Sequence, residues 1–301
     1  MNTNIKYILA AALLTLCNES FANLTILSCE PEWAAIATEI GGDKITVSSA
    51  TNAMQDPHHV EAKPSLIAKA RNADLLVCTG LELEIGWLPI LLQQSGNQKI
   101  AAGQPGHFEA GEFVAKLDVP SRLDRSDGDV HASGNPHIQT SPLTIEKVAT
   151  ALTKRLMEID AANADYYQNR FNNFDARWKI AMQQWEKQAA RLKGIQVVEH
   201  HKNLEYLWDW LGVTVVGTLE PKPGVEPSAA HLAELTAELK SKPAKMVVRA
   251  AYQDEHPSQW LSEHAKIPAV ALPFTVGGDD KSKDLFGLFD DTIALLLDAI
   301  K

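Results

Sequence analysis

The alternation of strand-like and helix-like segments constrains this chain of 301 residues more than any other feature. In the first half, apolar runs such as LTILSC and DLLVC alternate with stretches of helical spacing such as EWAAIATEI. The second half has the same style, with IQVVE, TVVG and KMVV separated by helical stretches. Strands joined by crossover helices form parallel sheets. The predicted fold class is therefore α/β, with two Rossmann-like lobes that each contain a parallel sheet.

A long helical stretch separates the two halves. No proline occurs from Leu143 to Lys193, and Gly194 follows as a typical helix end. The pattern predicts a break near 160–162, which divides the stretch into two helices. The second helix has apolar residues at helical spacing that indicate a buried face, namely Tyr167, Phe171, Phe174, Trp178, Met182 and Trp185. The predicted domains are a signal peptide over 1–22, an N-terminal lobe over 23–142, a rigid helical connector over 143–193 and a C-terminal lobe over 194–301.

The first residues have the order of an export signal. Lys6 provides a positive charge, and the apolar run YILAAALLTLC is too short to span a bilayer as a stable anchor. Small residues follow at Ser20 and Ala22, where a signal peptidase would cut. We therefore predict a periplasmic protein that is cleaved near Ala22. The alternative is a buried N-terminal helix.

The charge of the chain argues against one class of partner. The formal net charge is -10, which repels the phosphate backbone of nucleic acids. We therefore expect no nucleic-acid partner, whereas cations are compatible with this charge.

Cys29 and Cys78 each end an apolar, strand-like run. If the two strands are neighbours, a disulfide can form in an oxidising compartment, and two buried free thiols are the alternative. The chain has no C-x-x-C pattern, so a thiolate metal site or a redox enzyme is not indicated.

Four loops place metal-ligand chemistry where the chain leaves a strand. They contain His58 with His59, His137, His200 with His201, and Asp279 with Asp280. Ligands of α/β proteins bind beyond the carboxyl ends of strands, and two loops come from each half, so a cleft between the lobes can bring them together. Three neutral imidazoles and one carboxylate suit Zn²⁺, whose nitrogen and oxygen ligands lie at about 2.0–2.2 Å, whereas manganese favours more oxygen ligands.

The loops resemble motifs of the solute-binding proteins of zinc and manganese ABC importers (cluster A-I), and the resemblance covers nearly the whole mature chain. DPHHVEAKPS is similar to the family's D-P-H-x-aromatic-x-x-x-P-S loop, and GNPHIQTSP to its N-P-H-hydrophobic-W-x-x-P loop. HKNLEYLWDWLG is similar to the segment of its third ligand. Val60 and Gln139 depart from the usual aromatic residue and tryptophan. The resemblance implies a metal cleft between lobes joined by a long rigid helix.

The register of these motifs implies which residue of each loop binds the metal. The family's first ligand stands six residues before the Pro64 of the Pro-Ser pair, which is His58 and leaves His59 as a neighbour. The third stands eleven residues before Gly212, which is His201 and leaves His200 as a neighbour. A histidine there is typical of zinc members, whereas manganese members tend to have glutamate. The implied histidine ligands are His58, His137 and His201. Asp279 is the fourth predicted ligand because it is nearest the strand end, with Asp280 and Asp284 as alternatives.

The resemblance implies capture of Zn²⁺ and its delivery to a membrane permease, without enzymatic activity. The polar loop 120–136 contains Asp124, Asp127, Asp129 and His131, with His107 upstream. This loop captures metal transiently, or docks a metal-delivering chaperone, or is an ordinary solvated loop.

Other functions remain as alternatives. They are a manganese-binding protein of the same importer family, an exported zinc-dependent hydrolase with an open metal position, and an exported adhesin. The chain has no G-x-S-x-G motif and no carboxylate that a motif places as a general base. We further predict small lobe motions on metal release, because the connector is helical. Metal binding should weaken as pH falls through about 6.5, because protons compete for imidazole.

Overall fold

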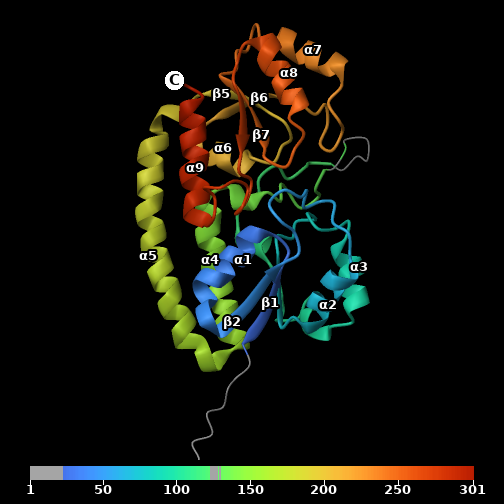
Figure 1. The fold of residues 1–301 in the computed structure, drawn as a ribbon, viewed down its shortest axis with the longest axis vertical. Helices are drawn as coiled ribbons and strands as arrows, with labels where there is room; N and C mark the ends of the chain where they lie inside the picture. The colour runs from blue at the N-terminus through green and yellow to red at the C-terminus, as the bar shows by residue number, and fades with distance from the viewer. Residues whose placement is uncertain (1–22, 123–127, 129) are drawn as a thin grey trace, which may run out of the picture.

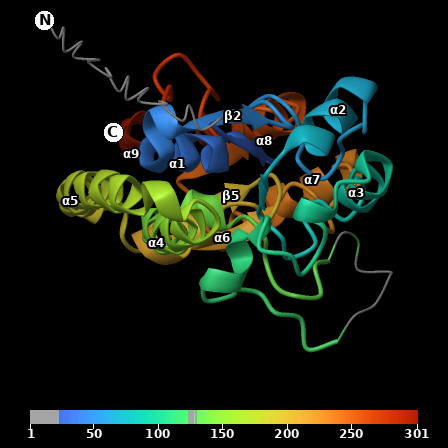
Figure 2. The same ribbon diagram turned by 90° about the horizontal axis from the view of Figure 1, so that it is seen from below.

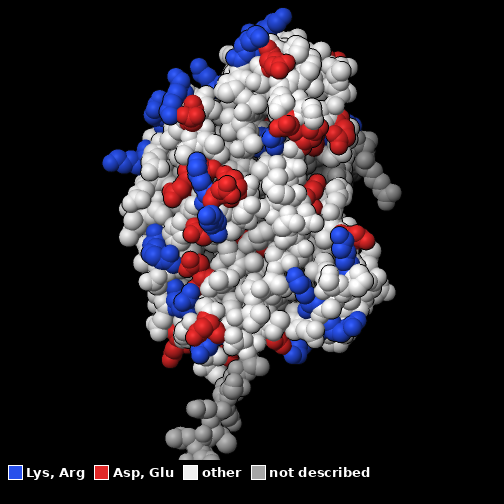
Figure 3. Space-filling view, in the orientation of Figure 1, with Lys and Arg blue, Asp and Glu red and all other residues white. Residues whose placement is uncertain are grey.

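The computed structural model describes residues 23–122, 128 and 130–301, and it has two α/β lobes joined by a long helical connector (Figure 1). The predicted signal peptide over 1–22 lies outside the described residues. Within the described ranges, no helix combines the length and the apolar character that crossing a membrane requires. Acidic and basic side chains are interspersed over the face of the molecule that Figure 3 shows.

The N-terminal lobe is built on a four-stranded parallel sheet. Its strands, in spatial order, are β2 (Ile45–Ser49), β1 (Leu24–Ser28), β3 (Leu75–Cys78) and β4 (His107–Glu109). Its helices are α1 (Pro31–Gly41), α2 (Pro64–Asn72) and α3 (Leu88–Ser95). Side chains alternate across a strand, so Ile26 packs with α1 on one face and Leu27 packs with α2 and α3 on the other. Both faces are therefore covered, as a parallel sheet requires.

The C-terminal lobe has the same topology. Its strands, in spatial order, are β6 (Thr214–Thr218), β5 (Gln196–Glu199), β7 (Met246–Ala250) and β8 (Ala269–Leu272), all parallel. Its helices are α6 (Glu205–Leu211), α7 (Ala229–Glu238), α8 (His256–Ala265) and α9 (Leu285–Asp298). The predicted α/β fold with two parallel sheets is confirmed, whereas the sequence pattern had not indicated α9.

The connector consists of α4 (Pro142–Ile159) and α5 (Ala164–Ala189). The predicted break is confirmed, because a 3-10 turn over Ala161–Asn163 separates the helices and the Tyr167 hydroxyl donates to Asp160 Oδ2 across it at 2.5 Å. Figure 1 shows α5 running the length of one side of the molecule, and Figure 2 shows α4 and α5 on the side opposite α2 and α3. Of the predicted buried face of α5, every member is buried except Phe171, which is half-buried.

A single cluster of buried apolar side chains extends through both lobes and the connector. It includes Trp33 of the N-terminal lobe, Trp178 of α5, and Val248 and Phe289 of the C-terminal lobe. Trp178 contacts Phe289 edge to face at a centroid distance of 5.6 Å. The lobes therefore share one core along α5, and a large lobe rotation would have to break apolar contacts at both ends.

Two features of the N-terminal lobe could not be determined from the sequence and are decided by the tertiary structure. The run QKIAA was expected to be a strand, but Gln98–Ile100 form a 3-10 turn, because the Asn97 side chain accepts from Lys99 N and caps it. The fourth strand is β4 instead. Cys29 and Cys78 form a disulfide between the ends of the neighbouring strands β1 and β3, which settles the alternative left open by the sequence.

Candidate metal centre

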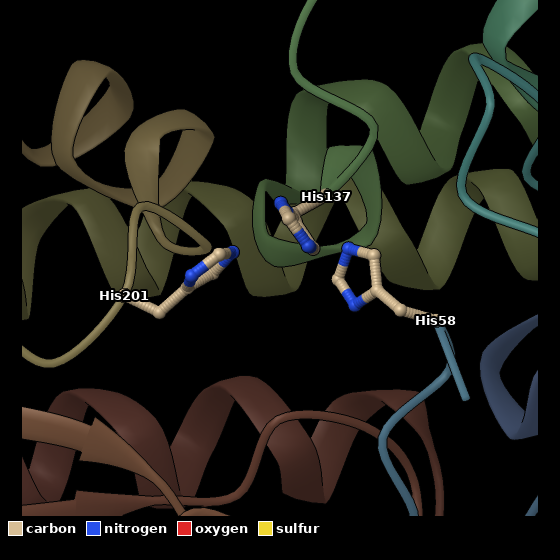
Figure 4. Close-up of side chains that lie close together, drawn as sticks. All are labelled: His58, His137 and His201. Atoms are coloured by element: carbon tan, nitrogen blue, oxygen red, sulfur yellow. The ribbon is translucent and has the colours of Figure 1, made fainter. Parts of the chain in front are cut away.

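Three histidines from distant parts of the chain converge between the lobes. His58 lies in the loop after β2, His137 directly precedes the 3-10 turn that leads into α4, and His201 follows β5. One ring nitrogen from each lies within 4.8 Å of the others. Figure 4 shows the rings of all three pointing toward one another. The structure therefore brings together three of the four side chains that the sequence singled out.

An oxygen atom holds the Nδ1 of each ring. The Nδ1 atoms of His58, His137 and His201 lie 2.7, 2.9 and 2.6 Å from Asp56 Oδ1, Asn135 Oδ1 and Glu220 Oε2. Because these acceptors favour a proton on Nδ1, the lone pair of Nε2 is left for a ligand. Within the part of the chain that the structure describes, the buried Nε2 atoms of His58 and His137 have no hydrogen-bond partner. Buried nitrogen without a partner is costly, so the donor set fits a metal ion.

The first two histidines are oriented by the same local device. Asp56 Oδ1 accepts from the backbone N–H of His58 at 2.9 Å, and Asn135 Oδ1 accepts from that of His137 at 3.0 Å. One oxygen thus holds both the backbone and the ring of the residue two positions later, as in an Asx turn.

His201 is oriented by a residue that the sequence analysis missed. Glu220 follows β6, the strand that pairs with β5, and its Oε2 also accepts from Gly224 N at 2.8 Å. The only signal in the sequence was a carboxylate just after β6, whose neighbour in the sheet, β5, is followed by His201. Strand order is not visible in a single sequence, so this signal could not be used.

Hydrogen bonds tie the His137 loop to the C-terminal lobe. Asn135 Nδ2 donates to Lys202 O at 2.9 Å, and the Tyr206 hydroxyl donates to Asn135 O at 3.0 Å. The same hydroxyl accepts from Leu117 N at 3.1 Å. The second and third histidines are therefore held in one network.

Burial favours the neutral form of His137. It is the largest cause that holds the pKa of His137 well below its ordinary value, and the neighbouring His58 and His201 lower it further. Burial would raise the pKa of Asp56, but the hydrogen bond and charge of His58 outweigh it and hold that pKa below its ordinary range. A neutral His137 and an ionised Asp56 are the forms that metal binding needs.

His59 and His200, the sequence neighbours of His58 and His201, differ in burial. The side chain of His59 is exposed, whereas His200 is buried. His200 Nε2 lies 4.0 Å from Glu220 Oε1, and burial lowers the pKa of His200. Neither belongs to the group of three converging nitrogens.

The structure does not bring the predicted carboxylate ligand into this group. Asp279 is exposed, and its Oδ1 accepts from the backbone N–H groups of Lys281 at 2.9 Å and Ser282 at 2.7 Å. Asp280 is also exposed, and Asp284 caps α9 by accepting from Gly287 N at 2.8 Å. Asp279 therefore stabilises the turn before α9, and Asp284 caps the helix itself.

The loop 120–136 brings a fourth imidazole to the site. The ring centroid of His131 lies 5.4 Å from that of His58 and 6.2 Å from that of His137. Burial, followed by the charges of His58 and His201, lowers the pKa of His131 to about 4. His107 is elsewhere, with Nε2 3.2 Å from Glu109 Oε1. Asp124, Asp127 and Asp129 lie outside the described residues.

Two cavities are lined by histidines of the site. A cavity of about 390 Å³ is lined by His131, His137 and His201, among others. A second, of about 230 Å³, is lined by His58, His59, His201 and Glu220, among others. His201 lines both cavities, so both border the group of histidines.

A second cluster of ligand-type atoms does not form a metal site. It contains Cys29, Cys78 and Glu84. Both cysteines are used in the disulfide, and Glu84 accepts from Thr79 N and Gly80 N at 2.7 and 3.1 Å.

The chain matches known proteins over most of its length. The family model described as "Zinc-uptake complex component A periplasmic" (ZnuA) matches residues 26–299. The chain is 24% identical to a manganese ABC transporter substrate-binding lipoprotein, PsaA, of Streptococcus pneumoniae over 89% of this chain and 85% of that protein. It is 23% identical to the high-affinity zinc uptake system protein ZnuA of Bacillus subtilis over 87% of this chain and 82% of that protein.

Solved structures share the fold. The chain resembles a crystal structure of ZnuA with a TM-score of 0.74 at 22% identity, over 91% of this chain and 99% of that one. It resembles a manganese-bound periplasmic metal-binding protein of Candidatus Liberibacter asiaticus with a TM-score of 0.76 at 17% identity, over 93% and 100% of the two chains. With a family model that covers residues 26–299, this chain belongs to the family of periplasmic zinc-uptake complex components A.

Proposed function

We propose that this protein captures Zn²⁺ outside the cytoplasm and delivers it to the membrane permease of an ABC importer. The observation that carries the proposal is the set of three converging imidazoles whose Nδ1 atoms are all held by oxygen acceptors. The family membership supports the transport role, because the relatives named above are binding components of metal transporters or metal uptake systems.

The donor atoms favour zinc over manganese. His58, His137 and His201 offer nitrogen, and imidazole suits zinc, whereas manganese prefers carboxylate, carbonyl and water oxygen. Relatives at nearly the same identity are named for manganese and for zinc, so the choice of metal rests on the donor set.

Each residue of the site has a defined part in capture. The Nε2 atoms of the three histidines bind the ion, and Asp56, Asn135 and Glu220 fix the rings and make them better donors. Metal enters and leaves through the two cavities beside His201. We further propose that the loop 120–136 receives zinc from a metal-delivering chaperone in the periplasm.

The direct test is metal titration in competition with a chelator, using purified mature protein. We expect one zinc ion per chain, weaker manganese binding, and weaker zinc binding at pH 5 than at pH 7.5. His58→Ala, His137→Ala and His201→Ala should each lower zinc affinity by more than the 10–100-fold that is typical for loss of an outer-shell partner. His59→Ala is the matched control for His58→Ala and should bind like the wild type. Equal zinc affinity in all four variants would refute the proposal.

The rival function is a zinc-dependent hydrolase, which needs an open metal position and a free base. The two carboxylates nearest the histidines, Asp56 and Glu220, are both engaged with ligand rings, which disfavours it. Zinc-dependent turnover of ester, peptide or phosphate substrates that disappears in His58→Ala would favour the hydrolase instead.

A further inference from the structure

The most informative unassigned group in the molecule is the imidazole of His131. Its ring stacks on that of His58, with an interplanar angle of 28°. Its Nε2 is buried and, among the residues that the structure describes, has no hydrogen-bond partner. The Nε2 atoms of His58 and His137 share this condition. Three neighbouring unpartnered nitrogens of the same type indicate a common ligand.

The backbone that follows His131 is held by two hydrogen bonds. Ala132 N donates to Glu82 Oε2 at 2.5 Å, and Asn135 N donates to Leu117 O at 2.8 Å. Glu82 ends a turn in which Gly80, Leu81 and Glu82 all have positive φ angles of 73°, 53° and 70°. Non-glycine residues adopt such angles at a cost that the surrounding structure must offset. This strained turn holds the carboxylate that positions the segment carrying His131.

We propose that His131 supplies the fourth ligand of the metal through Nε2, so that the ion is held by four histidines and not by three histidines and Asp279. The inference rests on the proposed metal-binding function. Zinc in closed protein sites is almost always four-coordinate, and the three converging histidines supply three of the four donors. The His131 imidazole is not part of the set whose ligand atoms lie within 4.8 Å of one another, so binding requires a shift of this side chain toward the other three.

Charge balance supports a fourth neutral ligand. Asp56 and Glu220 each place a carboxylate on the Nδ1 of a ligand ring, at 2.7 and 2.6 Å. These two carboxylates offset the double charge of the ion without a third carboxylate in the coordination sphere. Asp279 is meanwhile exposed and engaged with two backbone N–H groups. Four nitrogen donors would strengthen the preference for zinc over manganese.

The test compares His131→Ala with Asp279→Asn in the full mature chain. The measurements are zinc affinity by chelator competition, the visible spectrum of bound Co²⁺, and the number of imidazoles around zinc by X-ray absorption. We expect His131→Ala to lower zinc affinity by more than the 10–100-fold that is typical for loss of an outer-shell partner, to remove one imidazole and to shift the Co²⁺ bands. Asp279→Asn should leave the zinc affinity, the number of imidazoles and the Co²⁺ spectrum unchanged. His256→Ala, at an exposed histidine, is the control for removal of any histidine.

The outcomes separate this inference from the proposed function. If His131→Ala matches the wild type in affinity and spectrum, or if Asp279→Asn weakens binding, the four-histidine site is wrong while zinc capture stands. If the wild type binds no zinc, or binds it equally well after His137→Ala, the proposed function itself fails. Circular dichroism of each variant checks that the fold is intact, and His131→Asp, which restores a ligand of another type, should recover part of the lost affinity.

Discussion

At the scale of single residues, one local motif occurs three times within the described residues, with different consequences. Asp56, Asn135 and Asp254 each hold the ring Nδ1 of the histidine two positions later. The rings of His58 and His137 converge, whereas the side chain of His256 is 82% exposed, and the hydrogen bond that its ring donates to Asp254 raises the pKa of His256. The motif therefore orients a ring, but burial and convergence decide whether the ring can bind metal.

This difference gives a matched pair of variants. Asp56→Ala should lower zinc affinity by about 10–100-fold, because the His58 ring loses the acceptor that fixes its tautomer and orientation. Asp254→Ala removes the same contact from His256 and should leave affinity unchanged. Chelator competition at pH 7.5 measures both. Equal affinity in the two variants would show that the acceptor on Nδ1 contributes nothing to binding.

At the scale of elements, the ends of neighbouring parallel strands position both the site and its supports. His201 and Glu220 follow the paired strands β5 and β6, and the disulfide joins the ends of β1 and β3. The turn after β3 buries the Glu84 carboxylate, and burial raises the pKa of Glu84 to about 7. The contributions of the disulfide and of Glu84 to stability can be tested by variants that leave the metal ligands unchanged.

The disulfide should contribute to stability and not to metal selection. It joins residues that are 49 positions apart, and closing a loop of this length removes entropy from the unfolded chain worth about 4 kcal/mol. The double variant Cys29→Ala/Cys78→Ala should therefore unfold at lower urea concentration than the oxidised wild type. Its zinc affinity in the folded state should be unchanged. An unaltered unfolding midpoint would contradict the stabilising role.

Buried Glu84 should make stability depend on pH. Its folded pKa is raised from 4.5 to about 7, so its favourable contribution is complete below pH 4.5 and is lost as pH rises through 7. Glu84→Gln cannot ionise, so its unfolding free energy relative to wild type should increase by on the order of 2–3 kcal/mol between pH 4.5 and pH 8. Urea unfolding of both metal-free proteins at the two pH values measures this difference. A difference that does not change with pH would refute the assignment.

At the scale of the whole molecule, the connector makes the lobes one mechanical unit. Helices of both lobes, α1 and α9, pack against α5, and one apolar cluster includes residues of both lobes (Figure 1). The Glu32 carboxylate also accepts a hydrogen bond from the Thr275 hydroxyl across the lobes. Metal binding is therefore expected to move loops near the site more than it moves the lobes.

Spin labels can measure this directly. Labels at exposed Gln94 in α3 and Glu238 in α7 report the separation of the lobes by pulsed electron resonance. Their distance should change by less than about 2 Å when zinc is added, as in other pre-organised binding proteins. A label pair between Gln94 and Val119, beside the larger cavity, serves as the local reporter and should change more. A large change in the distance between the labels at Gln94 and Glu238 would mean that the lobes open as a hinge in spite of their shared core.

Much of this arrangement follows from local patterns in the chain. The alternation of strands and helices determines parallel sheets with both faces covered, and the proline-free stretch determines the connector with its break at Asp160. The loops after strands are therefore identifiable, and so are the histidines in them. The register of the family's Pro-Ser motif, which is known only from the resemblance, also distinguishes His58, which joins the group, from His59, which is exposed.

Only the tertiary structure decides which distant groups meet. It places Glu220 on His201 and His131 beside His58, leaves Asp279 in a turn before α9, and joins Cys29 to Cys78. The physical reason is that spacing in a sequence reports neighbours within a helix or strand, whereas these contacts depend on strand order and on the paths of loops. The sequence by itself determined the fold and the histidine chemistry, and the folded chain determined what surrounds each imidazole.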